Sequence, residues 1–538
     1  MHQVFQAGAM RTRVATFAIA AIMSWGASVT SLKAAITEAQ VLVVYNSASA
    51  DGTALKNSYL AAHPGIPANH VFNLNDASLL VSQVTYADFV AKIRNPIRNY
   101  LTSLGAAELQ SIISIVLIRP IPHRVFDSDN VVVGDNPSGM IAEFLPPGSG
   151  GQADVTYASV DAELVLLWQN LDAGEAGGAM DSKSDNLIDN PYHMLSTEIH
   201  TFSRANIQTQ KTLATFGGLG VTWVSSGAGA TALTSGDLYL VCRIDAPSLA
   251  AAQASIGRAQ NLYANKATQI ILLDAYDGAL AGGWIDNGAL YTSGDPFNAG
   301  IDYSDTRTVL QGQGWTVRYD TTTNFVDPPE ETRTLIGFAS YGENHSANGA
   351  GDNPAGDGTY PTSGYRYGRG AIFNPLESYS GRDLNGLGQH PGIPQGQVGD
   401  FIGAGGTFAV GLVWEPLSFA VADNECIMQR MLVNQRTWAE AAYSGIPVLS
   451  WQHVVLGDPL GRFQAILNDP GLPKGDMDGS GSVNGRDIHW FVQVMTQGIA
   501  GYRTAFPTLD PIARGDFTND LVVDAADVPA FRAALLAP

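Results

Sequence analysis

The 538-residue chain predicts an α/β protein with a mainly parallel sheet, followed by a small α-helical module that carries two EF-hand-like loops. Continuous apolar runs such as 112–118 (IISIVLI) are typical of strands that are buried on both faces of a sheet. Segments with helical spacing alternate with these runs, which favours a parallel α/β arrangement. Asp-rich loops that begin at Asp476 and Asp516 predict the helical module near the C-terminus.

The composition limits the classes of function. An apolar fraction of 45% is ample for a packed core, and the length allows two or three domains. The net charge of −21 argues against nucleic acid as a partner, because phosphate recognition needs a Lys/Arg-rich surface. The charge is compatible with bound calcium and with an extracellular setting.

The N-terminal segment predicts export. Arg11 and Arg13 precede the apolar run 14–23 (VATFAIAAIM), and small residues follow up to Ala35. This order is typical of a signal peptide, which we place at 1–36. The alternative is a membrane anchor, but the run is too short to span a bilayer well. We therefore expect an extracellular, cell-surface or periplasmic protein without a membrane span after cleavage.

Residues 37–236 are expected to form an N-terminal α/β half. Gly/Pro clusters make the stretch 127–235 less regular than the rest. The expected elements of this half are strands at 40–46, 70–74 and 112–118 and helices at 53–62, 86–104 and 159–168.

A second α/β half is expected over 237–465, and a linker with two prolines and a glycine over 466–474. The loop-rich stretch 340–405 follows a predicted strand, so it should lie at the carboxyl edge of the sheet, where open α/β sheets bind ligands. The expected elements of this half are strands at 238–244, 269–273, 315–319, 335–339 and 407–414 and helices at 248–265 and 419–443.

The final 475–538 segment contains the clearest site pattern. The loop 476–487 has oxygen donors at the spacing of a calcium loop and Gly481 at its sixth position, where a sharp bend is needed. The predicted ligands of this first loop are Asp476, Asp478, Ser480, Ser482 through its carbonyl, Asn484 and Asp487.

A second loop, 516–527, repeats the spacing at an offset of 516 − 476 = 40, with Leu521 where glycine is preferred. Its predicted ligands are Asp516, Thr518, Asp520, Val522 through its carbonyl, Asp524 and Asp527. Each loop is followed by an apolar helical pattern. Two such units in one short segment, each loop ending in Asp rather than Glu, resemble a type I dockerin module. The resemblance implies Ca²⁺, a cohesin-like or cell-surface protein partner bound through 475–538, and a link to polysaccharide breakdown.

Several segments of the body also carry a resemblance. The runs 41–49 (VLVVYNSAS), 116–125 (VLIRPIPHRV), 239–248 (YLVCRIDAPS) and 337–348 (GFASYGENHSAN) resemble an uncharacterised family of exported bacterial proteins over about 38–465. The second half is more distantly similar to gingipain-type cysteine peptidases, at Tyr341-Gly342, Ser378–Ser380 and Gly457-Asp458-Pro459. This likeness implies a three-layer, caspase-like body with a related N-terminal half.

The candidate catalytic residues depart from that peptidase pattern. The peptidases use a histidine at the first strand end and a cysteine at the second, but no cysteine lies near Ser380 in this chain. One interpretation is that His345 and Ser380 form a base–nucleophile pair and that Glu343 orients the imidazole. The alternative is a polar turn and a solvated loop histidine.

Other chemistry is left open by the sequence. Metal or sugar could bind the polar loop residues of the 340–405 stretch, and paired carboxylates could hydrolyse glycosides. The residues concerned are Glu343, Asn344, Asp352, Asn353 and Asp357 for the loop, and Asp274, Asp277 and Glu415 for the carboxylates.

We therefore expect an exported calcium-binding protein whose dockerin-like module is attached to an α/β body of unproven activity. The alternative is an extracellular hydrolase, either a peptidase relative with an altered nucleophile or a polysaccharide-degrading enzyme, acting on a peptide or a glycan.

The chain has two cysteines, Cys242 and Cys426. In an exported protein they could form one disulfide, or each could be a small buried apolar side chain. Cys242 lies in the apolar run 238–242, which favours burial.

Overall fold

The structure is a computed structural model. It describes residues 35–126, 157–169, 188–195, 200–202, 211–217, 220–225, 233–275, 303–322, 324–342, 360–384, 395–414 and 420–537. The predicted signal peptide lies outside the described residues except for its last two. None of the helices in these ranges combines the length and apolarity that a membrane crossing needs.

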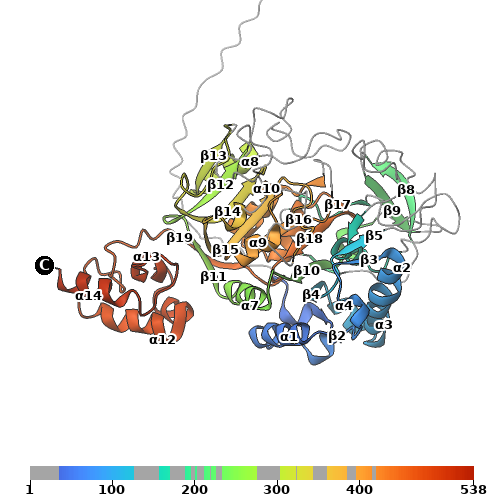
Figure 1. Cartoon of the computed structure of the whole chain (residues 1–538), viewed down its shortest axis with the longest axis horizontal. Coiled ribbons are helices and arrows are strands. Elements are labelled where there is room, and N and C mark those ends of the chain that lie inside the picture. Colours follow the sequence, from blue (N-terminus) through green and yellow to red (C-terminus); the bar gives the residue numbers. More distant parts are fainter. Residues whose placement is uncertain are drawn as a thin grey trace, which may run out of the picture. The chain divides into compact units, whose positions relative to one another are not determined.

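A ten-stranded sheet forms the centre of the protein (Figure 1). Neighbouring strands pair in parallel except β16 and β18, which pair antiparallel. The prediction of an α/β protein with a mainly parallel sheet is therefore confirmed. Across the sheet the strands are β13 (Thr316–Asp320), β12 (Gln269–Asp274), β14 (Thr334–Ser340), β15 (Arg366–Pro375), β16 (Phe408–Leu412), β18 (His453–Leu456), β10 (Leu240–Ile244), β4 (Ser114–Ile118), β1 (Val41–Tyr45) and β2 (Val71–Asn73).

The central strands are buried along their whole length. Every residue of β4, β10 and β16 is buried, and so is every residue of β14. Strands that are covered on both faces have no solvent side to fill with polar residues, which is why they read as continuous apolar runs in the sequence.

Helices pack in two groups against this sheet. In one group α1 (Ala50–Ala62) packs against α7 (Leu249–Arg258), beside it in Figure 1, and α7 packs against α9 (Val398–Gly403). In the other, α8 (Tyr303–Gly312) and α11 (Trp438–Gly445) both pack against α10 (Asn424–Leu432). Both groups also contact strands of the sheet, which is consistent with a three-layer α/β body.

The same strand order occurs twice in the sheet. The first four sheet strands along the chain lie in the order β2-β1-β4-β10, and the next four lie in the order β13-β12-β14-β15. In each set the second strand is outermost, the first lies beside it, and the third and fourth follow on the other side.

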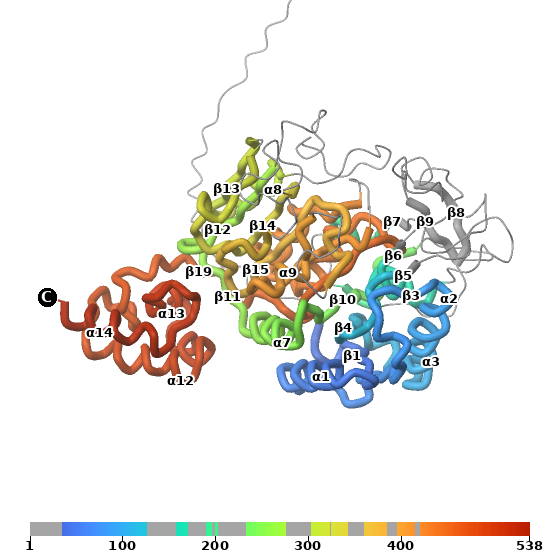
Figure 2. The backbone as a smooth tube through the Cα atoms, in the orientation of Figure 1, coloured from blue at the N-terminus to red at the C-terminus, as the bar shows by residue number. Residues whose placement is uncertain are grey.

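Two expected helices differ in the structure. The prediction of a helix over 248–265 is wrong at its end, because α7 stops at Arg258 and β11 (Leu262–Asn265) follows. Asn261 has a φ of +51°, a left-handed conformation that ends the helix, and β11 then pairs with β19 (Phe463–Leu467), which lies beside it in Figure 2.

The second difference is in the region 419–443, where a single helical stretch was expected. It forms α10 and α11, and Gln435 between them has a φ of +53°. A left-handed residue cannot continue a right-handed helix, so the stretch divides there.

The C-terminal module is built from α12 (Asp487–Ala505), α13 (Pro511–Gly515) and α14 (Val528–Leu536). Gly498, with a φ of +75°, kinks α12. The module has its own apolar core, formed by Met477, Phe491, Val494, Tyr502, Val523 and Phe531. The predicted linker joins it to β19, whose last two residues belong to that linker.

Cys242 and Cys426 are both buried and both free of any disulfide. Each therefore packs as a small apolar side chain, and burial raises the pKa of both thiols.

Candidate metal centre and sheet edge

Loop 1, residues 476–487, holds two carboxylates against its own backbone. Asp476 accepts hydrogen bonds from the amides of the fifth and sixth loop residues at 3.0 and 2.8 Å. Asp487 accepts from the amides of the third and ninth residues at 3.0 and 2.8 Å. Both carboxylates are buried. The backbone therefore fixes the first and last predicted ligands inside the loop.

Loop 2, residues 516–527, repeats these contacts position by position. Asp516 accepts from the amides of the fifth and sixth residues at 3.2 and 2.9 Å. Asp527 accepts from the third and ninth at 2.8 and 2.9 Å. Both carboxylates are buried here too. The two loops share one backbone arrangement although their sequences differ at most inner positions.

The loops also share an unusual backbone conformation at their fourth and sixth residues. In loop 1 these are Gly479 and Gly481, with φ of +71° and +88°; in loop 2 they are Asn519 and Leu521, with φ of +60° and +69°. Glycine adopts this region without strain and asparagine tolerates it, but leucine does not. Loop 2 therefore stores strain at Leu521 that loop 1 avoids.

The donor set of loop 1 suits a hard cation. Oxygens of Asp476, Asp478 and Asp487 lie within 4.8 Å of one another, the one group of this kind among the residues that the structure describes. The Ser482 carbonyl accepts hydrogen bonds from the Ser480 hydroxyl at 3.3 Å and from Asn484 Nδ2 at 3.1 Å, whereas Asn484 Oδ1 accepts from the Arg486 amide at 3.0 Å. Carboxylate, hydroxyl, amide and carbonyl oxygens are the ligands that calcium prefers.

Loop 2 has fewer carboxylates near its centre. Thr518 replaces the aspartate of the third position, and its hydroxyl donates to Asp516 at 3.3 Å. The remaining predicted ligands, Asp520, Val522 and Asp524, are exposed. Among the described residues only loop 1 brings three carboxylates within 4.8 Å of one another, so we expect a cation to bind loop 2 more weakly than loop 1.

The strands β14 and β15, which precede the predicted catalytic residues in the sequence, end side by side at the carboxyl edge of the second half of the sheet. The Leu376 amide, just after β15, donates to the carbonyl of Ser340, the last residue of β14, at 2.6 Å. Glu343 and His345 lie outside the described residues, as do Asn344, Asp352, Asn353, Asp357, Asp277 and Glu415. The structure therefore brings the two strand ends together without placing the proposed base.

Ser380, the proposed nucleophile, is fully buried. Its hydroxyl oxygen accepts a hydrogen bond from the Leu412 amide at 3.2 Å, and its carbonyl accepts from Val398 at 2.8 Å. These contacts describe a side chain that stabilises the packing of the turn onto β16 and α9.

A buried carboxylate lies in the same turn. Glu377 accepts hydrogen bonds from the Tyr360 hydroxyl at 2.6 Å and from the Gly396 amide at 3.1 Å. Gly342 has a φ of +92°, and a Cβ there would lie 2.3 Å from the Glu377 carboxylate. The glycine at the first strand end therefore makes room for this carboxylate.

Asp274, the last residue of β12, is the candidate carboxylate at this edge that the structure does place. It is fully buried, and its carboxylate accepts from the Val326 amide at 3.0 Å. Burial raises its pKa to about 8, so the folded protein holds it protonated at neutral pH. A protonated carboxyl group is not a nucleophile, and a fully buried one cannot reach a substrate. Asp274 in this state therefore does not fit the role of a glycosidase nucleophile.

The sequence reasoning missed a polar cluster beneath the Gly-Asp-Pro motif. Asp458 accepts hydrogen bonds from Tyr59 at 3.1 Å and from Gln260 at 3.0 Å, and it contacts His63 at 2.7 Å. His63 also contacts Glu38 at 3.2 Å. These residues come from the start, the middle and the end of the body sequence, so no local spacing could have indicated them.

Comparisons of the chain with protein-family models, curated proteins and solved structures found no match.

Proposed function

We propose that the chain is an exported calcium-binding protein in which a paired-loop, dockerin-like module is attached to an α/β body. The observation that carries the proposal is the pair of matched loops. Four backbone hydrogen bonds of loop 1 recur at equivalent positions of loop 2, around equivalent buried carboxylates. Calcium would add positive charge to these clustered carboxylates, of which Asp476 has Arg514 Nη1 at 3.4 Å.

A caspase-like fold with a related N-terminal half is part of the proposal. Its support is the strand order that occurs twice in the sheet, together with β16 and β18, the pair that runs antiparallel. The first copy of this order extends past the predicted boundary at 236, because it includes β10. Fold alone does not establish activity, so the calcium proposal does not depend on it.

The proposed partner of the module is a cohesin-like or cell-surface protein. The module exposes apolar side chains at Ile488 and Val528, which occupy equivalent positions in the two loop-helix units. Val492, one helical turn beyond Ile488, is exposed as well. Exposed apolar side chains on the two helices favour a protein-binding surface.

Calcium titration of the full-length protein by calorimetry tests the proposal. We expect binding by the wild-type protein, loss of one site in Asp476→Ala, and loss of both when Asp516→Ala is added. Ser482→Ala is the matched control, because its predicted ligand is the carbonyl. Wild-type protein that binds no calcium would refute the calcium proposal.

An extracellular hydrolase is the second candidate function. The observation that favours it is the adjacency of the β14 and β15 ends, since convergent strand ends are where α/β enzymes carry out chemistry. Screening the full-length protein against peptide and glycan panels tests it. Activity that survives in Ser380→Ala would remove Ser380 as nucleophile, and the absence of turnover on both panels would count against the whole alternative.

A further inference from the structure

Buried polar side chains join the C-terminal module to the body. On the body side, two residues of β11 hold one carboxylate of the module. The Tyr263 hydroxyl donates to Asp510 Oδ1 at 2.7 Å, and Asn265 Nδ2 donates to Asp510 Oδ2 at 2.6 Å. Asn265 also donates to the Asp469 carbonyl at 2.7 Å and accepts from the Asp469 amide at 3.0 Å. All four side chains are buried.

Arg514 extends this network to loop 1. Its guanidinium donates twice to the Asp469 carboxylate, from Nε and Nη2, at 2.8 Å each. Its remaining nitrogen, Nη1, donates to the carbonyl of Asp476, the first residue of loop 1, at 2.6 Å. The guanidinium is planar and its donors are fixed relative to one another, so Asp469 and Asp476 must keep their relative positions for all these bonds to form.

Asp510 and Asp469 are also linked directly. The Asp510 amide donates to the Asp469 carboxylate at 2.7 Å, so the carboxylate held by β11 and the carboxylate held by Arg514 lie in one hydrogen-bonded unit. Asp469 therefore connects a body strand, the short helix α13 and loop 1.

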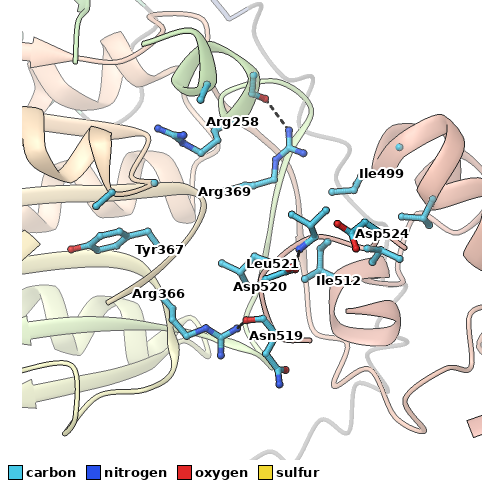
Figure 3. Close-up of a pocket in the computed structure, with 18 of the residues that line it drawn as sticks. Arg258, Arg366, Tyr367, Arg369, Ile499, Ile512, Asn519, Asp520, Leu521 and Asp524 are labelled. Atoms are coloured by element: carbon cyan, nitrogen blue, oxygen red, sulfur yellow. Dashed lines mark hydrogen bonds between the residues drawn. The ribbon is translucent and has the colours of Figure 1, made fainter. Parts of the chain in front are cut away.

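Loop 2 contacts the body at a more open place, shown in Figure 3. Arg366 donates to the Asn519 carbonyl at 2.8 Å, beside a pocket of about 740 Å³ that Arg258, Arg369 and Leu521 also line. This contact is exposed, in contrast to the buried network at loop 1.

We propose that cation occupancy of loop 1 and docking of the module on the body are one coupled equilibrium, transmitted from Asp476 through Arg514 to Asp469 and Asn265. The inference rests on the proposed calcium function. Without a cation, three carboxylates of loop 1 converge within 4.8 Å and repel one another, which favours opening of the loop. Opening displaces the Asp476 carbonyl and so disturbs the guanidinium that holds Asp469.

Coupling of this kind is reciprocal. If calcium strengthens docking, then docking must strengthen calcium binding by the same factor. Substitutions in the body, at residues that touch neither loop, should therefore weaken calcium binding by loop 1. Tyr263 and Asn265 are such residues.

The experiment uses the full-length protein with Asp516→Asn as the parent, so that loop 1 dominates the calcium titration. Tyr263→Phe removes only the hydroxyl that reaches Asp510, and Asn265→Ala removes the larger set of bonds. Tyr100→Phe is the matched control, because the Tyr100 hydroxyl donates to Asn69 in the N-terminal half, at 2.8 Å. We expect calcium affinity to fall about fivefold or more in both test variants and to stay unchanged in the control.

Hydrogen exchange supplies a second readout. Removal of calcium by a chelator should speed amide exchange in 262–267 and 463–469 but not in β1. Equal calcium affinity in Tyr263→Phe, Asn265→Ala and the parent would overturn the coupling while leaving calcium binding intact. A parent without calcium binding at loop 1 would overturn both proposals, so the two failures are distinguishable.

Discussion

Phe491 and Phe531 stack face to face in the core of the module, with ring centroids 4.1 Å apart and planes 5° apart. Their offset in the sequence, 531 − 491 = 40, equals the offset between the first ligands of the two loops. Each phenylalanine occupies the same place in the helix that follows its loop. The two loop-helix units therefore meet through equivalent residues, and the repeat seen in the sequence is also a repeat in packing.

Truncation of this stack should destabilise the module. Phe531 is buried, and replacement of a buried phenylalanine by alanine costs about 3–5 kcal/mol. Native-state hydrogen exchange of α12 and α14 in Phe531→Ala would measure the loss. Leu536→Ala is the control, because that side chain is 73% exposed and its removal should change little. Equal protection in both variants would contradict a role of the stack in stability.

The sixth loop positions provide a second prediction. Nothing lies within 4 Å of a Cβ at Gly481, so Gly481→Ala introduces only the strain of a positive φ, about 1 kcal/mol. Leu521→Gly removes the corresponding strain from loop 2. We expect calcium affinity to fall in the first variant and to rise in the second, each about fivefold, by calorimetry of the full-length protein. Changes in the same direction would contradict this account.

His63 predicts a pH dependence of stability. Burial lowers its pKa, but contacts with Asp458 and Glu38 outweigh burial and leave the pKa above the ordinary value of 6.5. Folding then favours the protonated ring, so this contribution is complete below about pH 6.5 and is lost as pH rises through the folded pKa. Urea denaturation over pH 6–9 should show a fall in the free energy of unfolding that His63→Gln reduces. Superimposable pH profiles of wild type and His63→Gln would contradict this role of His63.

Asp274 predicts a pH dependence from a carboxyl group. Its pKa rises from 3.8 to about 8, so the folded state keeps a proton that the unfolded state has released. Stability from this group is present below pH 3.8 and is lost as pH rises towards 8. Asp274→Asn should therefore gain stability relative to wild type as pH rises from 5 to 8. Asp51→Asn, which changes an exposed carboxylate in the first turn of α1, is the control. A difference that does not grow with pH would refute a protonated Asp274.

The features that could be predicted from the sequence are those that depend on a local pattern of residues. Continuous apolar runs located β4 and β12, and donor spacing located the loops. Prediction was wrong at 262–265, because the partner of β11 is β19, which lies far downstream at the end of the body, and no local pattern records that pairing. The segment that forms β15 was expected to belong to a loop-rich stretch, because Gly368 and Gly370 lower its local strand propensity. It forms a strand because it pairs with neighbouring strands of the sheet.

The candidate site residues also differ in whether a local pattern identifies them. The loop carboxylates follow a fixed spacing, so they were identifiable from sequence. Arg514 and Asp469 follow no fixed spacing, because they lie on different segments that come together only in the folded chain. The sequence allowed Ser380 to be a nucleophile or part of a polar turn, but it could not show that neighbouring segments bury this residue. Whether a short polar motif is buried depends on the segments that pack around it, and the sequence of the motif itself gives no information about them.

The ion pair between Asp469 and Arg514 has a consequence for cleavage of the chain. Asp469 lies within the predicted linker 466–474, and Arg514 lies in the module. Leu472, between them in the sequence, is 69% exposed. A protease that cut at Leu472 would separate the two covalently but leave every hydrogen bond among Asp469, Asp510 and Arg514 in place. The nicked protein would therefore remain a complex of two fragments, and its module would leave only when those contacts dissociate.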